Sequence, residues 1–116
     1  MTEMAKRPWL DSVVVVDDDA ITEWHSGQPT FSIHWSQIET VSVAVDPYVS
    51  GPRPCVGFWM IAGHGKCIRL PLTGKPGLDV LNLRLVALPG FDQNALRTAL
   101  EAEAVGKGGD FLCWRR

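Results

Sequence analysis

Alternating apolar and polar positions dominate the first three quarters of the chain. In residues 30–35, Phe31, Ile33 and Trp35 alternate with polar side chains, and valines alternate with smaller residues in residues 40–45. A repeat of two is typical of a β-strand that buries one face. Alternating and Val-rich segments together predict seven strands, at residues 12–17, 20–25, 30–35, 40–45, 55–62, 66–72 and 81–85.

Turn-forming residues separate these predicted strands. Asp17, Asp18 and Asp19 follow the first strand, and residues 63–65 (Gly-His-Gly) have the composition of a tight hairpin turn. Residues 46–54 contain three prolines, which cannot continue a regular ladder of backbone hydrogen bonds. We therefore expect an irregular loop in the middle of the chain.

The repeat changes after residue 90. Alanine and leucine side chains between residues 95 and 100 follow the spacing of one helix face, and Asp92 is a good N-cap. Gly106 is a plausible C-terminal stop. These signals predict one helix over residues 92–105.

Seven strands followed by one helix are the elements of a pleckstrin-homology-like (PH-like) domain. Residues 33–41, Ile-His-Trp-Ser-Gln-Ile-Glu-Thr-Val, resemble the stretch of bacterial PH-like domains in which a strand ends at Trp, makes a short turn and restarts. The resemblance implies a mainly β (α+β) fold, a seven-stranded antiparallel sandwich or partly open barrel capped by one C-terminal helix. It places the domain at residues 12–105, after a lead-in at residues 1–11.

The last residues depart from that family pattern. Residues 106–116 contain a Gly-rich loop and then the apolar stretch 111–114, which is long enough for an edge strand. We expect this tail to dock along a sheet edge or the helix flank, with Arg115 and Arg116 in solvent. Docking on a second subunit is the alternative.

Composition and charge narrow the function classes. A chain of 116 residues with 46% hydrophobic residues is expected to form a single folded domain. Its formal net charge of -2 and pI of about 5.8 argue against a nucleic-acid binder, which needs a clustered basic surface. Since the sequence contains neither a long apolar run nor a secretory signal, the expected location is cytoplasmic.

The predicted first hairpin argues against a lipid function. PH-like folds are associated with phosphoinositide binding, for which the resemblance would place lysines and arginines near this hairpin. Asp17, Asp18 and Asp19 stand there instead, and three carboxylates repel a polyphosphate head group. We therefore expect neither membrane nor phosphoinositide binding, and we interpret the aspartates as turn residues rather than as a metal site.

The residues that most often carry catalysis show no recognisable motif. Cys55, Cys67 and Cys113 lack the C-x-x-C spacing, and an odd number leaves at least one free thiol, as in a reducing compartment. The sequence contains no Gly-rich phosphate loop, paired-His zinc motif or G-x-S-x-G elbow. We predict no catalytic residue, no metal and no cofactor.

Aromatic and arginine side chains outside the predicted core are the candidate binding residues. Tyr48 and Arg53 belong to the proline-rich loop, and both residue types are common in interface hot spots. Trp24 is opposite in phase to the apolar face of its strand, and Trp114 lies near the C-terminus. Exposed aromatics of this kind favour a protein interface.

The function predicted from these observations is a non-enzymatic protein-interaction module of PH-like fold, such as an adaptor or an immunity-type inhibitor of a basic toxin. The alternative is a small-molecule-binding or enzymatic domain with a pocket between the sheets. A deep pocket lined by His and Cys would favour the enzyme, and a shallow aromatic patch the binding module. The expected partner is a protein, and the sequence is compatible with both a monomer and a homodimer.

Overall fold

The computed structural model describes residues 12–47 and 55–116, and its strands form two separate antiparallel sheets. The sheet orders are β1-β2-β3 and β6-β5-β4-β7. The elements are β1 (Ser12–Val16), β2 (Ala20–His25), β3 (Gln28–His34), a 3-10 turn (Trp35–Gln37), β4 (Thr40–Pro47), β5 (Cys55–Gly63), β6 (Lys66–Pro71), α1 (Leu78–Val86), α2 (Gln93–Ala104) and β7 (Gly109–Arg115). The α+β class and the seven antiparallel strands in two sheets agree with the sequence prediction, although the sheets do not close into a barrel.

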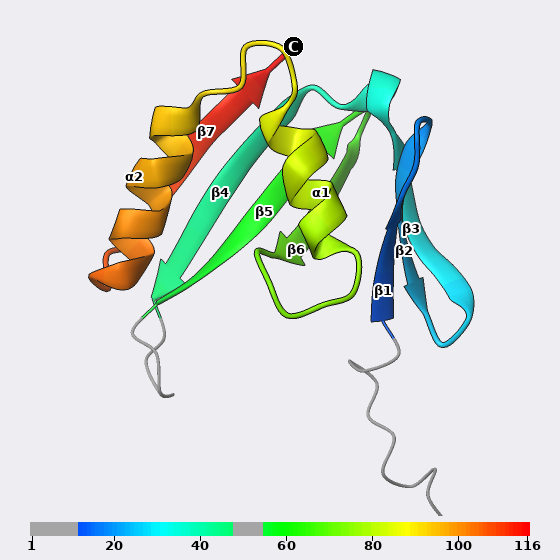
Figure 1. Ribbon diagram of the computed structural model, residues 1–116, viewed down its shortest axis with the longest axis horizontal. Helices are drawn as coiled ribbons and strands as arrows, with labels where there is room; N and C mark the ends of the chain where they lie inside the picture. The colour runs from blue at the N-terminus through cyan, green and yellow to red at the C-terminus, as the bar shows by residue number, and fades with distance from the viewer. Residues whose placement is uncertain (1–11, 48–54) are drawn as a thin grey trace, which may run out of the picture.

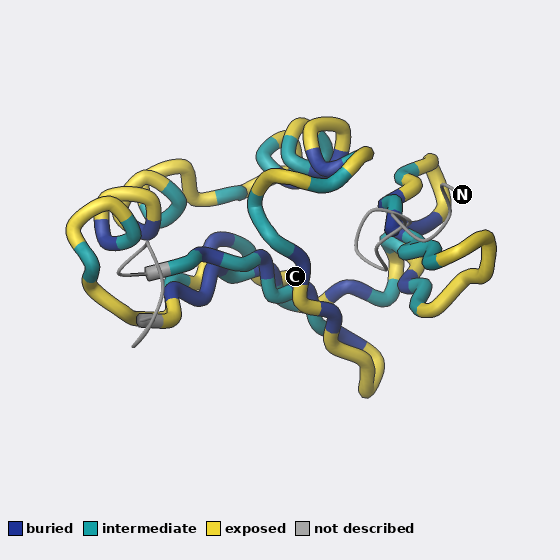
Figure 2. Tube along the Cα trace, turned by 90° about the horizontal axis from the view of Figure 1, so that it is seen from below, coloured by how far each residue is buried: buried dark blue, intermediate teal, exposed yellow. Residues whose placement is uncertain are grey.

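Both helices lie on the same face of the four-stranded sheet (Figure 1). Seen from below, the helices are above this sheet, the three-stranded sheet stands at one side, and no described element covers the opposite face (Figure 2). The helices run in opposite directions, so the start of α1 and the end of α2 are at the same end of the molecule (Figure 1). None of the described helices has the length and apolar character needed to cross a membrane.

The core fills the space between the four-stranded sheet and the helices. Val41, Val43 and Val45 point inward from β4, as the alternating pattern predicts, and are at most 2% exposed. Trp59 and Ile61 oppose Val43 and Val41 on β5. The helices add Leu78, Leu81, Leu85 and Ala99 to the same cluster.

The seventh strand predicted at residues 81–85 is wrong, because this segment belongs to α1. Leu81, Leu83 and Leu85 alternate like a strand, yet Leu83 is 71% exposed while Leu81 and Leu85 are fully buried. The buried set is Leu78, Leu81 and Leu85, which follows the helical spacing i, i+3, i+7. A short apolar run fits both repeats, and packing against the sheet selects the helix.

The seventh strand is instead the C-terminal tail. β7 pairs with β4 of the same chain, from Val45 opposite Gly109 to Thr40 opposite Arg115. The predicted edge strand is therefore confirmed, and the tail docks in cis. The observed order is six strands, two helices and a strand, so the predicted order of seven strands and one closing helix is wrong.

The helix predicted over residues 92–105 is confirmed as α2. Asp92 is its N-cap, and the carboxylate of Asp92 accepts a hydrogen bond from the backbone N–H of Ala95 at 3.0 Å. The backbone N–H of Asp92 also donates to the carbonyl of Cys113 at 2.7 Å, which joins the start of α2 to β7.

Both terminal arginines are exposed, as the sequence predicts, and Arg116 also makes specific contacts. Arg116 is exposed, but its guanidinium donates to the backbone carbonyls of Ile38 and Trp35, each at 2.8 Å. The backbone N–H of Arg116 donates to Glu39 at 2.9 Å. The end of the chain thereby fastens the turn that connects the two sheets.

The segment leading into α1 holds the three-stranded sheet in place. The backbone N–H of Val14 on β1 donates to the carbonyl of Pro76 at 2.9 Å. Lys75 forms a salt bridge of 2.6 Å with Glu23 on β2, and the side chains of both residues are mostly buried. Lys66 on β6 also donates to the carbonyl of Ser32 on β3 at 3.0 Å, and the apolar residues of both sheets share one core cluster.

Candidate functional site

Of the four binding residues predicted from the sequence, the two that the structure describes, Trp24 and Trp114, lie on different sheets. Tyr48 and Arg53 lie outside the described residues. Trp24 is half-buried on β2, paired with Val13 of β1 on the outward face of the three-stranded sheet. Trp114 is half-buried on β7 in the other sheet, packs against the core, and donates its indole N–H to the carbonyl of Pro89 at 2.9 Å. Trp24 thus remains a surface candidate, whereas Trp114 has a structural contact.

Within the described part of the chain, no group of three or more His, Cys, Asp or Glu side chains could hold a metal ion. His64 is exposed at the tip of the β5–β6 hairpin, where it adopts a positive φ of 55°. Cys67 is free and exposed, whereas Cys113 is free and buried. Burial raises the pKa of the Cys113 thiol to about 11, so Cys113 is a poor nucleophile at neutral pH.

Ser12 and His25 are the pair that most resembles a nucleophile and its base. The hydroxyl of Ser12 lies 2.9 Å from Nδ1 of His25, on neighbouring strands. Ser12 is only 8% exposed, so a substrate has little access to its hydroxyl. This hydrogen bond is best explained as a cross-strand contact.

The aspartates of the first hairpin form a turn, as the sequence predicts. One carboxylate oxygen of Asp17 accepts hydrogen bonds from the backbone N–H groups of Asp19 and Ala20, both at 2.8 Å. These bonds, that of Ala20 first, lower the pKa of Asp17 below its ordinary value. The carboxylate of Asp17 is therefore engaged by its own turn.

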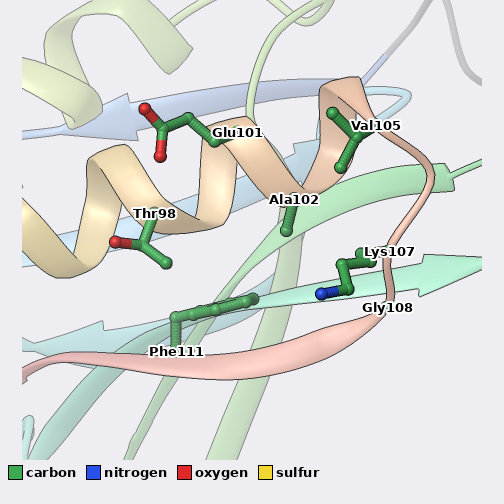
Figure 3. A pocket seen from close by; sticks show the side chains of 7 residues that line it. All are labelled: Thr98, Glu101, Ala102, Val105, Lys107, Gly108 and Phe111. Carbon is green, nitrogen blue, oxygen red and sulfur yellow. The ribbon is translucent and has the colours of Figure 1, made fainter.

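A pocket of about 360 Å³ lies between α2 and β7 (Figure 3). Phe111 forms its floor beneath Ala102, and the amino group of Lys107 points across the pocket toward Phe111 (Figure 3). The carboxylate of Glu101 points away from Phe111 (Figure 3). This pocket offers one cation that points toward an aromatic side chain, and an apolar wall, without a second group positioned for proton transfer.

A second hollow lies on the other flank of α2, between the two helices. Two cavities of about 220 and 150 Å³ lie there. Both are lined by Leu72, Thr73 and Leu100, which shows that they adjoin each other. We call this the interhelix groove, and we define it by the apolar residues Trp59, Leu72, Val86, Leu96 and Leu100.

The floor of the interhelix groove is held rigidly. Trp59 is 2% exposed and donates its indole N–H to the side-chain oxygen of Asn82 at 2.6 Å. The amide of Asn82 in turn donates to the carbonyl of Leu72 at 3.1 Å. Phe91 packs edge-on against the Trp59 ring, with 6.4 Å between the ring centroids. A fixed floor of this kind keeps the shape of the groove before any partner arrives.

The charge near this groove is negative. Glu103 lines one of its two cavities and accepts a hydrogen bond from the backbone N–H of Gly57 at 2.6 Å. Asp79 lies in the first turn of α1 but lines neither cavity. No Lys, Arg, His or Cys lines either cavity of the groove. The groove is an apolar channel with an acidic end.

Sequence reasoning missed this groove. Its walls come from residues of α1, α2, β5 and the segment after β6, which are brought together only by tertiary packing. The exposed apolar residue Leu100, 44% accessible at the edge of the predicted helix stripe, is the signal that could have indicated it.

Comparison with known proteins assigns no family: no protein-family model matches this chain, and neither the curated proteins nor the solved structures include a match to it. Inference about function therefore starts from the geometry described above.

Proposed function

We propose that this protein is a non-enzymatic protein-interaction module that binds apolar side chains of a partner in the interhelix groove. The observation that carries the proposal is the lining of the groove, which combines a fixed indole with Leu and Val side chains and contains no His, Cys, Lys or Arg. Apolar walls and an ordered aromatic floor are typical of binding sites. Among the described lining residues, Glu103 and Thr73 carry groups of a kind that catalysis can use, and the Glu103 carboxylate already accepts a hydrogen bond from the backbone N–H of Gly57.

The acidic end of the groove indicates the kind of partner. A segment with apolar side chains spaced along it and a basic residue at one end complements both the Leu-rich walls and the carboxylate of Glu103. The net charge of -2 favours a basic protein in the same way. An adaptor, or an immunity-type inhibitor of a basic toxin, is the form of the proposal that these charges support best.

The PH-like resemblance contributes little to this proposal. Its nine-residue motif coincides with the end of β3, the turn Trp35–Gln37 and the start of β4, as the resemblance implies. The fold places a helix, α1, where the resemblance implies a strand. We do not extend the proposal to membranes, phosphoinositides or nucleic acids, because Asp17, Asp18 and Asp19 stand where a lipid head group would require cations. Free thiols at Cys67 and Cys113 suit the reducing cytoplasm.

The test compares partner capture by the wild-type protein and by a groove variant. Leu100→Lys removes an apolar wall and opposes a basic partner, and Leu100 is accessible enough for a lysine to be tolerated in the fold. Leu83→Lys is the matched control, since Leu83 is exposed on α1 and lines neither cavity of the groove. We expect a protein captured by the wild type and by Leu83→Lys to be lost with Leu100→Lys. Equal capture by all three proteins would contradict a groove site.

A second candidate function is small-molecule binding in the pocket between α2 and β7. Its volume of about 360 Å³ is within the range of ligand pockets, and Lys107 faces Phe111 across it. An anionic ligand with an apolar body fits this arrangement. A thermal-shift screen with such compounds should give hits that disappear in Lys107→Ala, and a screen without such hits removes this candidate.

A further inference from the structure

β7 is an edge strand of the four-stranded sheet, whose order is β6-β5-β4-β7. Its pairing with β4 shows which backbone groups of β7 face that edge. The backbone N–H of Arg116 donates to the carbonyl of Glu39, the residue before β4. Hydrogen-bonded pairs alternate along an antiparallel ladder, so Val43, an even number of residues further along, also bonds to β7. Phe111 is opposite Val43, and the backbone groups of Phe111 therefore point toward β4.

The backbone N–H and C=O groups of Asp110 and Leu112, on either side of Phe111, consequently point away from β4. Both residues are exposed, and no described helix or loop makes a backbone hydrogen bond with either of them. The free part of the edge ends at the next residue, because the N–H of Asp92 donates to the carbonyl of Cys113 at 2.7 Å. Backbone groups left open at a sheet edge are a template for one more strand.

The pocket between α2 and β7 lies where a side chain of such an added strand would point. Residues directly opposite each other on paired strands point to the same face of a sheet. Phe111 points toward α2 and forms the floor of the pocket (Figure 3). Val105 of the opposite wall is 70% exposed, so the pocket is open on this flank of α2. An apolar side chain opposite Phe111 would therefore enter the pocket beneath α2.

Lys107 gives the added strand a direction. The charged residues that line the pocket are Glu101 and Lys107. The Glu101 carboxylate points away from Phe111, whereas the amino group of Lys107 points toward it (Figure 3). Lys107 comes just before β7, so it lies at the end of the edge where an antiparallel strand finishes. A terminal carboxylate is attracted there, and the terminal ammonium of a parallel strand would be repelled.

We propose that the free edge of β7 binds the C-terminal end of a partner protein as one more antiparallel strand. The backbone of Asp110 and Leu112 holds the segment, an apolar side chain enters the pocket, and the terminal carboxylate lies beside Lys107. A chain end suits this edge because the contact between Asp92 and β7 closes its other end. This proposal names a ligand for the pocket of the second candidate function and rests on that pocket being a binding site. The interhelix groove is on the other flank of α2 and is not involved.

The test titrates the full chain, labelled with ¹⁵N, with acetylated hexapeptides of threonine that carry Phe, Leu or Ala as the residue before the last. We expect the amide resonances of Asp110 and Leu112 to move, and the Phe and Leu peptides to bind at least tenfold more tightly than the Ala peptide. Amidation of the peptide C-terminus should weaken binding about threefold in the wild type and have no effect in Lys107→Ala. Absence of binding by every peptide at about 2 mM overturns the proposal.

Asp110→Pro tests the strand pairing itself. Proline removes the outward N–H and is tolerated on an edge strand where that group faces solvent, so the circular dichroism spectrum should not change. We expect affinity for the Phe peptide to fall about fivefold or more. Asp110→Ala, which keeps the N–H, and Leu100→Lys, in the interhelix groove, are the matched controls and should bind like the wild type.

Equal binding of the Phe peptide by Asp110→Pro and Asp110→Ala would place the peptide in the pocket without strand pairing and would overturn the proposal. A small molecule in the pocket should be indifferent to Asp110→Pro, so this result leaves the second candidate function standing. If Asp110→Pro does not fold, Val105→Asp replaces it, because Val105 is exposed and its carboxylate variant opposes both the apolar side chain and the terminal carboxylate. Unchanged affinity of Val105→Asp contradicts the proposal equally.

Discussion

Gly77 occupies a position where both backbone conformation and space require glycine. Its φ is +92°, and a Cβ atom would lie 1.7 Å from the carbonyl oxygen of Val14 on β1. Gly74 has nearly the same φ, +93°, yet a Cβ there meets nothing within 4 Å. Comparing the same substitution at the two glycines therefore separates the cost of backbone strain from the cost of a steric collision.

We predict that Gly77→Ala destabilises the fold much more than Gly74→Ala. The left-handed backbone costs an alanine about 1–2 kcal/mol at either position. At Gly77 the collision with β1 adds about 1–3 kcal/mol, as overpacking does. Urea unfolding of the two variants measures the difference, and equal losses would show that β1 does not approach Gly77 closely.

Cys113 and Cys67 should differ sharply in reactivity. In a Cys55→Ser background, we expect a thiol reagent near neutral pH to label Cys67, which is exposed, and to spare the buried Cys113 until the protein unfolds. The pH dependence follows from the raised pKa of Cys113. Its contribution to stability is present below the ordinary value of 9.0 and is lost as the pH rises toward about 11. Rapid labelling of both thiols in the folded protein would contradict the burial of Cys113.

At the scale of elements, β7 pairs with β4 and forms one edge of the four-stranded sheet. Deleting residues 111–116 removes Phe111, Cys113 and Trp114 from the packed cluster and leaves the β4 edge unpaired. Burying a side chain of the Phe kind contributes about 1.5–3 kcal/mol, and half-buried residues contribute less. We expect a clear fall in melting temperature, and a truncated protein that melts like the full chain would contradict the docking of β7.

Arg116 and Arg115 provide a finer test of the same element. Arg116→Ala removes two hydrogen bonds to the carbonyls of Ile38 and Trp35 and should cost about 1 kcal/mol. Arg115→Ala, at an exposed position one residue earlier, should be nearly silent. Thermal unfolding of both variants measures the contrast, and equal melting temperatures would mean that these bonds contribute nothing.

The elements also show how far local pattern determines this fold. The turn at Asp17 and the N-cap at Asp92 are local features, so the first hairpin and α2 follow from the sequence. α1 does not, because Leu81, Leu83 and Leu85 alternate like a strand, and only the structure shows that Leu78 is buried with Leu81 and Leu85 while Leu83 is exposed. The outward position of Trp24 was predictable from strand phase. The interhelix groove was not, since residues such as Leu72, Val86 and Leu100 meet only after α1 and α2 have packed on the sheet.

The joint between the two sheets determines whether the molecule unfolds as one unit. The Lys75–Glu23 salt bridge crosses this joint at 2.6 Å, with only 16% and 22% of the two side chains exposed. The Arg84–Asp18 pair crosses the same joint at 3.5 Å, but the side chain of Asp18 is fully exposed. Water screens the second pair far more than the first.

We therefore predict a double-mutant cycle with a large coupling for the first pair and almost none for the second. Glu23→Gln and Lys75→Met, alone and together, should give a coupling of about 1–2 kcal/mol in the free energy of unfolding. The same cycle on Asp18→Asn and Arg84→Met should give a coupling indistinguishable from zero. Because Glu23 belongs to β2 and Lys75 to the segment before α1, a real coupling means that the three-stranded sheet gains stability from the helix side of the molecule. Hydrogen exchange in Glu23→Gln should then show β1 to β3 opening before β4 and β5. Unchanged protection of β1 to β3, together with zero coupling for both pairs, would mean that the apolar core and the backbone hydrogen bond between Val14 and Pro76 hold the three-stranded sheet without help from the salt bridge.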